Sequence, residues 1–359
     1  MSDIRVADDG VGPLEQMLQR LAGYYTDPEH EEIAINRPGE VWCRLRKQSV
    51  DGRLWIRVDD PRLDRAYLAS VCWAVANTTN QHFHPTDQKR PSSIFATLGE
   101  AGHRFAAVMG NVVQYGAADP LGGIGICIRQ GSNERTRVVN MEAWGVKLGD
   151  GVEHSVDRDT TITDPQVDAH RTIREALALG YDLLVSGGMS TGKTQFLNNI
   201  IDSLNPDLRI ITVEDTREIM LPKHPNHCHL LLPRTEGGSR FTYLSAIDII
   251  TRFTPDAVLV GEISTTNAAA LWNLSGIGHG SMMCTIHASN ADEAYAKLVD
   301  RVAQSSGHDI DRAKMLADAQ EKFCVVQLER EIDGRRIMTD VRRPKPKRDV
   351  TQRALSIGI

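Results

Sequence analysis

A glycine-rich octapeptide is the strongest chemical signal in this 359-residue chain, because residues 187–194 read GGMSTGKT and match G-x-x-x-x-G-K-[ST] at every fixed position. An apolar run at 183–185 precedes it and a helical pattern at 195–201 follows it, as the motif requires. In this setting the glycines turn backbone N–H groups onto phosphate oxygens, and the helix N-terminus adds a positive dipole. Lys193 is then expected to reach the β- and γ-phosphates, and the Thr194 hydroxyl to ligate Mg²⁺.

A second apolar run ends in an acid, since residues 255–262 read PDAVLVGE. In a parallel sheet the carboxyl ends of the strands form the edge at which ligands bind, so we expect Glu262 at that edge. There it can hold a magnesium-bound water or polarise the attacking water. Many phosphate-loop proteins have Asp where Gly261 stands, and an acidic strand end without a catalytic role remains the alternative on these residues alone.

Two more segments place polar groups after apolar strands. Residues 210–216 read IITVEDT, so Glu214 or Asp215 can orient water or pair with an arginine, with a helix cap as the alternative. Residues 278–288 read GHGSMMCTIHA, and a neutral imidazole at His287 can sense the γ-phosphate, with a structural histidine as the alternative.

The elements that must position these groups change in character along the chain. The first half mixes helical spacing with strand patterns, which is typical of an α+β domain: helices at 13–25 and 62–79, strands at 33–35, 41–43, 54–58, 104–108 and 124–128. In the second half short apolar strands alternate with helices, which predicts a mainly parallel sheet covered on both faces: strands at 183–185, 210–213, 257–260 and 282–286. Residues 325–341 indicate a closing hairpin.

These patterns predict an α/β protein of two domains, a smaller α+β N-terminal domain with its linker over 1–155 and a phosphate-loop domain over 156–345. The linker is placed near residue 155, where the sequence is polar and rich in turn residues. A basic tail over 346–359 is expected to be disordered.

Composition excludes several classes of protein. Hydrophobic residues make up 41% and charged residues 25%, which is ordinary globular usage. The net charge of −6 gives no overall field that would draw the chain onto nucleic acid. The N-terminal residues do not form a signal peptide, and no run approaches the roughly 18 apolar residues of a membrane span. Six cysteines without a C-x-x-C pair indicate buried, reduced thiols, so we expect a cytoplasmic protein.

Two other groups of residues have chemistry to consider. Residues 224–229 read HPNHCH, and imidazole and thiolate suit zinc, but the ligands are crowded and no second pair stands at finger spacing. Trp42, Trp55 and Trp73 are expected in the core or at an interface rather than as platforms for stacking bases.

The phosphate loop, the Glu214 segment, the Gly261-Glu262 strand end and the histidine segment follow one another in the order found in the secretion/traffic ATPases, which this chain resembles. These are the hexameric motors of type II and type IV secretion and of type IV pili. Three N-terminal segments resemble the type IV secretion branch in particular: residues 35–42 (INRPGEVW), 102–105 (GHRF) and 128–129 (IR). The resemblance covers residues 30 to 330.

This resemblance implies an ATP-hydrolysing hexameric motor that powers type IV secretion, pilus assembly or substrate transfer at the bacterial inner membrane. It implies a RecA-like C-terminal domain, with ATP and Mg²⁺ in the cleft between the two domains. Inner-membrane components of the apparatus are the implied partners, membrane association is peripheral, and no direct contact with nucleic acid is expected.

The resemblance also assigns roles to residues of this sequence. The implied catalytic residues are Glu262, Lys193, Glu214 and His287, and the metal is held by Thr194 and Glu262. The implied nucleotide contacts are Gly187, Gly188, Ser190, Thr191, Gly192, Lys193, Thr194, Gln195, Arg104 and Arg129.

The sequence departs from the family in two places. An arginine often follows the strand-end glutamate, whereas residues 263–265 here read IST. Arg234, Arg240 and Arg252 are further candidates for an arginine at the site or one contributed by a neighbouring chain. The C-x-x-C zinc insert usual in the type II branch is missing, which favours type IV secretion. The alternatives are a nucleic-acid-translocating RecA-like motor and a scaffold that uses ATP for assembly without hydrolysing it.

Overall fold

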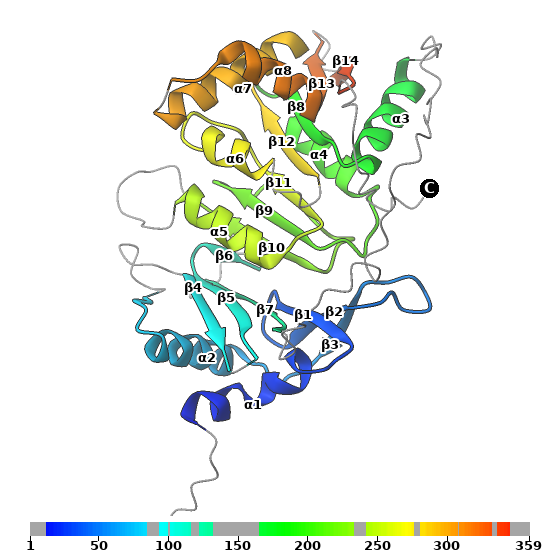
Figure 1. Ribbon diagram of the computed structural model, residues 1–359. Coiled ribbons are helices and arrows are strands. Elements are labelled where there is room, and N and C mark those ends of the chain that lie inside the picture. The colour runs from blue at the N-terminus through cyan, green and yellow to red at the C-terminus, as the bar shows by residue number, and fades with distance from the viewer. Residues whose placement is uncertain are drawn as a thin grey trace, which may run out of the picture.

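The computed structural model describes residues 12–84, 93–99, 101–115, 122–131, 165–232, 242–275, 281–307, 309–331 and 336–344. Within these residues the strands form two sheets, one above the other in Figure 1. The first is six-stranded in the order β3-β2-β1-β7-β5-β4, and the second is eight-stranded in the order β14-β13-β8-β12-β11-β9-β10-β6. The predicted α/β class, with a smaller α+β part preceding a mainly parallel sheet, is confirmed.

The first sheet is antiparallel and belongs to the N-terminal part of the chain. Its strands are β1 (His30–Ile35), β2 (Glu40–Leu45), β3 (Trp55–Asp59), β4 (Ser93–Leu98), β5 (His103–Gly110) and β7 (Gly123–Arg129). Two helices pack against it, α1 (Pro13–Tyr25) and α2 (Arg65–Thr78). The N-cap Asp64 starts α2 by accepting a hydrogen bond from the Tyr67 N–H at 2.8 Å. The sequence does not predict strand β4, because residues 93–98 (SIFATL) show no clear alternation of polar and apolar side chains, although Ile94 and Leu98 are buried.

The second sheet carries the phosphate loop. Its strands are β6 (Val113–Gln114), β8 (Asp182–Gly187), β9 (Ile210–Glu214), β10 (His227–Leu231), β11 (Ala257–Val260), β12 (Met282–Ile286), β13 (Phe323–Arg330) and β14 (Arg336–Arg342). The strands from β13 to β10 are parallel, whereas β14 and β6 pair antiparallel at the two edges. The closing hairpin predicted near 325–341 is therefore confirmed as β13 and β14.

Helices cover both faces of this sheet, as its apolar strands predict. Figure 1 shows α3 (Pro165–Ala178) and α4 (Lys193–Ile201) on one face. The other face is covered by α5 (Tyr243–Phe253), α6 (Ala268–Leu274), α7 (Ala291–Ser306) and α8 (Arg312–Lys322). Each face has its own apolar core, so the strands between them are buried on both sides.

The histidine-rich segment 224–229 lies partly in strand β10 rather than in a loop, which the sequence reasoning missed. Cys228, His229 and Leu230 are all buried, so β10 is a strand buried on both faces, and counting the buried His229 as polar hid its apolar surroundings. Among the described residues, no group of three or more His, Cys, Asp or Glu side chains is placed to hold a metal ion.

The two sheets are joined by a buried polar cluster at the turn between β1 and β2. The fully buried Arg209 donates from Nη1 to the side-chain oxygens of Asn36 at 2.9 Å and Asn226 at 2.8 Å. Its Nε donates to the Phe253 carbonyl at 2.8 Å, and its guanidinium lies 5.4 Å from the Trp55 ring. Part of the INRPGEVW segment is thus used to fasten the N-terminal sheet to the phosphate-loop half.

Two of the segments predicted from the sequence lie where the structure gives no description. The linker near 155 and the tail over 346–359 lie outside the described residues. All six cysteines are buried, and none forms a disulfide. Among the described residues, no helix is both long enough and apolar enough to cross a membrane.

Candidate active site

The glycine-rich octapeptide forms the loop between β8 and α4, as its pattern predicts. Gly192 precedes the helix with a φ of +86°, a left-handed conformation that residues with a Cβ rarely adopt. A Cβ on Gly187 would lie 2.5 Å from the Thr191 hydroxyl and 2.7 Å from the Leu328 carbonyl oxygen, so only glycine fits there. These two glycines hold the loop close to β13 and direct its backbone into the start of the helix.

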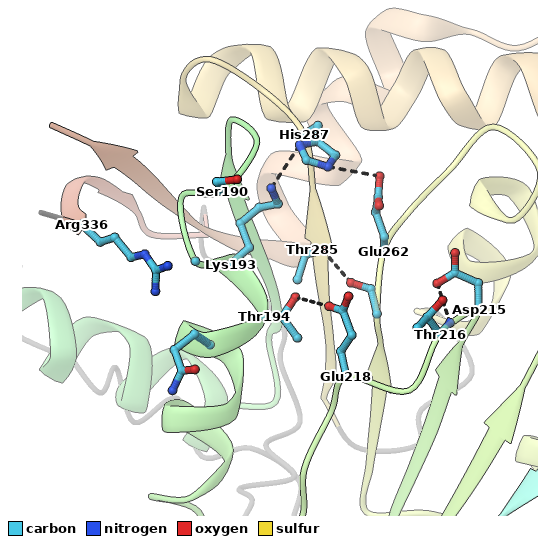
Figure 2. Close-up of a pocket in the computed structure, with 13 residues that line it drawn as sticks. Ser190, Lys193, Thr194, Asp215, Thr216, Glu218, Glu262, Thr285, His287 and Arg336 are labelled. Carbon is cyan, nitrogen blue, oxygen red and sulfur yellow. Dashed lines mark hydrogen bonds and ion pairs between the residues drawn. The ribbon is translucent and has the colours of Figure 1, made fainter. Parts of the chain in front are cut away.

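A cavity of about 530 Å³ opens between this loop and the carboxyl ends of β9, β11 and β12 (Figure 2). Its lining consists of polar side chains and glycines: Ser190, Gly192, Lys193, Thr194, Gln195, Asp215, Thr216, Glu218, Gly261, Glu262, Thr285, His287 and Arg336. The structure thus brings the loop, Glu262 and His287 together. It adds Glu218 and Arg336, which the sequence reasoning missed.

Lys193 is held at the centre of this cavity. Its Nζ donates to the carbonyl oxygens of Gly187 at 3.1 Å and Gly188 at 2.8 Å, and it lies 3.1 Å from His287 Nδ1. Burial lowers the pKa of Lys193, while the carboxylates of Glu262 and Glu218 act in the opposite direction. The ammonium group of Lys193 lies inside the phosphate loop, in the place where phosphate oxygens would bind, and the His287 imidazole is its neighbour.

His287 lies between the lysine and the strand-end acid. Its Nε2 lies 3.7 Å from Glu262 Oε1, so one imidazole contacts both Lys193 and Glu262 (Figure 2). Burial and the charge of Lys193 lower the pKa of His287, which favours the neutral imidazole. A neutral ring can accept a hydrogen bond from Lys193 through Nδ1 and donate one through Nε2.

Glu218 takes the position facing Thr194. The Thr194 hydroxyl donates to Glu218 Oε2 at 2.9 Å, and the nearby Asn198 amide donates to the Glu218 carbonyl at 3.2 Å. No strand pattern marks Glu218, because it lies on the irregular segment after β9. The sequence shows only that Glu218 follows Glu214 by four residues. This spacing does not predict a shared site, because the segment after β9 has no regular structure from which the direction of Glu218 could be inferred.

Glu214 is buried and serves the backbone of that same segment. Its Oε1 accepts hydrogen bonds from the N–H groups of Glu218 at 2.8 Å and Ile219 at 2.7 Å. Its Oε2 accepts from the Thr212 hydroxyl at 3.1 Å. Glu214 is not among the residues that line the cavity, whereas its neighbour Asp215 is. In this geometry Glu214 positions Glu218, and a catalytic role for Glu214 stays a prediction.

The two N-terminal arginines lie side by side but away from the loop. Arg104 and Arg129 are opposite each other in the register of β5 and β7, and both are exposed. Arg129 Nη2 lies 3.2 Å from Glu31 Oε1. Neither arginine is among the residues lining the cavity, so this chain does not bring them to its own phosphate loop.

Of the three further candidate arginines, the structure describes only Arg252, which lies away from the cavity. The Arg252 guanidinium packs 4.3 Å from the ring centroid of Phe95, and Arg252 does not line the cavity. Arg234 and Arg240 lie outside the described residues.

The arrangement fits a magnesium-bound triphosphate. The loop and Lys193 supply donors for phosphate oxygens, and Glu218 with the Thr194 hydroxyl supplies the oxygen ligands that Mg²⁺ prefers. Glu262 provides a carboxylate at the strand edge that can accept a proton from water. These groups together can catalyse phosphoryl transfer to water.

Comparisons with known proteins agree with this chemistry. The family model described as "Type II/IV secretion system protein" matches residues 160–333. The type IV secretion system protein VirB11 of Brucella suis is 25% identical over 295 residues, covering 80% of this chain and 77% of that protein. PtlH of Bordetella pertussis, also a type IV secretion system protein, is 27% identical over 301 residues, covering 81% of this chain and 82% of that protein.

The fold of most of the chain has a counterpart among solved structures. The crystal structure of the VirB11 ATPase from the Brucella suis type IV secretion system, in complex with sulphate, superposes with a TM-score of 0.73 at 25% identity. The superposition covers 91% of this chain and 93% of that chain. The similarity therefore includes both sheets and is not confined to the phosphate-loop half.

Proposed function

We propose that this chain, a traffic ATPase of the type IV secretion branch, hydrolyses ATP to ADP and phosphate in the cavity between α4 and the strand ends of β11 and β12. Its task is to power substrate transfer or pilus assembly by a type IV secretion apparatus. The observation that carries the proposal is the contact of Lys193 with His287, and of His287 with Glu262, around a loop shaped for phosphate.

The chain's own residues provide each part of the reaction. Lys193 exchanges its contacts with the loop carbonyls for oxygens of the β- and γ-phosphates. Glu262 accepts a proton as water attacks the γ-phosphorus and the bond to the β,γ-bridging oxygen breaks. Thr194 and Glu218 would hold Mg²⁺, which when bound neutralises charge on the phosphates.

Loss of the terminal phosphate changes the surroundings of His287. When the terminal phosphate is absent, Lys193 again contacts the imidazole, so the hydrogen-bond partner of His287 differs between the two nucleotide states. His287 directly follows β12. This strand lies between β8, which precedes the phosphate loop, and β11, which ends two residues before Glu262. Such a link turns the state of the nucleotide into a movement of neighbouring elements.

The working assembly is a ring of six copies, peripheral on the cytoplasmic side of the inner membrane and in contact with membrane components of the apparatus. The position of Arg104 and Arg129 supports assembly, because these exposed guanidinium groups do not line the phosphate cavity of their own chain and are accessible to the loop of a neighbour. The ATP site would then be complete only between two chains.

Mixing two inactive variants tests this arrangement. Lys193→Ala disables the loop, and Arg104→Ala with Arg129→Ala disables the donated arginines, so each variant alone is expected to lack ATPase activity. Mixed rings should regain activity, because an intact loop then meets intact arginines of its neighbour. A mixture that exchanges subunits and stays inactive would place the arginines and the loop in the same chain.

Activity per chain against protein concentration tests the proposed function itself. Specific activity is expected to rise with concentration and to vanish in Lys193→Ala. A monomer in the presence and absence of nucleotide would contradict the ring. A folded, ring-forming protein without ATPase activity, even with its membrane partners present, would favour the scaffold alternative.

A further inference from the structure

Arg301 lies next to the strand-end acid without lining the ATP cavity. Its Nη1 donates a hydrogen bond to the carbonyl oxygen of Ile263, the residue directly after Glu262. Arg301 belongs to α7, whereas Ile263 follows β11, so the contact joins residues 38 positions apart in the chain. Because Arg301 is not among the residues that line the cavity, any effect that it has on bound nucleotide must pass through the residues that it holds.

The backbone around Glu262 is held by a series of hydrogen bonds. The Glu262 carbonyl accepts from Asn267 Nδ2 at 2.9 Å, and the Ile263 N–H donates to the Thr285 carbonyl at 2.8 Å. The next carbonyl, that of Ile263, accepts from Arg301. Ile263 is fully buried, and a buried carbonyl that loses a charged donor pays the cost of desolvation. Loss of Arg301 would therefore favour a rotation of this peptide group toward water, and Glu262 precedes it directly.

One face of α7 holds both ends of the segment that follows Glu262. Arg301 contacts the start of this segment, and Ser305 lies one turn later on the same helix. The Ser305 Oγ accepts a hydrogen bond from the Ala269 N–H at 2.8 Å, near the start of α6. The helix itself begins shortly after His287. Arg301 thus connects the helix that follows His287 to the backbone that presents Glu262.

The guanidinium of Arg301 is also close enough to act on His287. Burial, the charge of Lys193 and the charge of Arg301 all lower the pKa of His287. His287 Nε2 in turn lies 3.7 Å from Glu262 Oε1 (Figure 2). The cation of Arg301 therefore lies within electrostatic range of the imidazole that contacts Glu262, and a hydrogen bond to the backbone fixes its position.

We propose that Arg301 is a positioning residue of the ATPase reaction: by holding the carbonyl of Ile263, it keeps the Glu262 carboxylate directed at the attacking water. The proposal rests on the proposed function, in which Glu262 accepts the proton of that water. A displacement of about 1 Å at a catalytic group can lower a rate by about 100-fold, so a backbone contact one residue away is sufficient to matter. Binding of ATP and Mg²⁺ should not depend on Arg301, because it does not line the cavity.

Kinetics of Arg301→Met test this role, because methionine keeps much of the apolar stem of the side chain but has no donor. We expect kcat to fall by about tenfold or more, while KM for ATP and the Mg²⁺ requirement change by less than about twofold. Arg301→Lys keeps a cationic donor and should restore kcat to within about threefold of the unmodified protein. Lys297→Met, one turn earlier on α7, is the matched control, since Lys297 Nζ pairs with Glu293 of the same helix at 2.9 Å. This control should change kcat by less than about twofold.

A double-mutant cycle shows whether Arg301 acts through Glu262. In the Glu262→Gln protein, Arg301→Met should lower the residual kcat by less than about twofold, because the carboxylate that it would displace is already absent. Lys193→Ala gives the background of the assay. Calorimetry in the Glu262→Gln protein, where ATP is consumed slowly, should give the same ATP affinity with and without Arg301→Met, within about twofold.

Arg301→Gln is a second variant for the case that Arg301→Met does not fold. It keeps a polar side chain at this half-buried position but is too short to reach the Ile263 carbonyl, so the same results are expected.

An unchanged kcat in the folded Met or Gln variant would overturn the role of Arg301 and leave the proposed function standing. A loss of kcat that persists in full in the Glu262→Gln protein, or a matching loss of ATP affinity, would also overturn it, because the effect would then not pass through Glu262. An unmodified, ring-forming protein without ATPase activity would instead contradict the proposed function, on which the role of Arg301 depends.

Discussion

Lys193 Nζ lies 3.1 Å from His287 Nδ1, although the two residues are 94 positions apart in the chain. The contact joins the start of α4 to the end of β12, so the loop lysine and the imidazole share one hydrogen bond. The same imidazole lies 3.7 Å from Glu262 through its other nitrogen. Protonation of His287 would therefore place two cations side by side and remove the acceptor that Lys193 uses.

Activity is expected to fall at acid pH as His287 becomes protonated. Because burial and Lys193 lower the pKa of His287 below its ordinary value of 6.5, the acid limb of kcat/KM should have its midpoint below pH 6.5. His287→Gln keeps an oxygen that can accept from Lys193 but does not titrate in this range, so the limb should disappear. The ratio of the two pH profiles cancels titration of the substrate. A constant ratio down to the onset of unfolding would contradict the role of His287.

Glu218→Gln should raise the Mg²⁺ concentration needed for half-maximal activity by about tenfold, because the carboxylate facing the Thr194 hydroxyl loses its charge. Glu262→Gln should instead lower kcat by about 100-fold or more with little change in the Mg²⁺ requirement, since a general base is removed. Magnesium titrations of both variants at saturating ATP provide the measurement. An identical response of the two variants would show that Glu218 has no separate part in holding the ion.

Local sequence was enough for the centre of the site. The octapeptide specifies its own conformation, because glycine at position 192 readily adopts the left-handed φ of +86° before the helix and Lys193 follows it directly. Glu262 and His287 could be placed because each follows a short apolar strand, and parallel strands end at one edge. The order of strands and helices along the chain was therefore enough to predict that these groups lie together.

Residues that reach the site through segments without regular structure could not be predicted from the sequence in this way. Glu218 reaches Thr194 through a segment without a repeating pattern, and Arg336 reaches Gly192 from the start of β14, more than 140 residues after the loop. Their positions depend on tertiary packing rather than on local periodicity. The two-residue strand β6 likewise could not be foreseen, because it joins the sheet of the other half of the chain.

Arg209→Met should destabilise the folded chain by about 3 kcal/mol, because it leaves a buried polar cluster without its donor. The carbonyl of Phe253 and the amides of Asn36 and Asn226 lose hydrogen bonds at the junction of the two sheets. Urea unfolding gives the free energy, and Arg53→Ala, at an exposed turn, is the control with an expected change within about 0.5 kcal/mol. A loss for Arg209→Met no larger than for the control would show that apolar packing alone holds the junction.

Asp182→Asn is expected to become more stabilising, relative to the unmodified protein, as pH rises. Asp182 Oδ1 accepts a hydrogen bond from the Met282 N–H at 2.7 Å, and burial raises the pKa of this carboxyl from 3.8 to about 7. Between these values the folded state binds a proton that the unfolded state does not, so the stability of the unmodified protein falls with rising pH through this group.

The asparagine has no such proton, and its oxygen can accept the same hydrogen bond. The difference in unfolding free energy between variant and unmodified protein should therefore grow by about 2–3 kcal/mol from about pH 5 to about pH 8. Urea unfolding of both proteins at the two pH values measures it. Because the comparison is a difference between pH values, a constant cost of the extra amide N–H groups cancels. Parallel pH profiles of the two proteins would show that Asp182 is ionised in the folded state throughout this range.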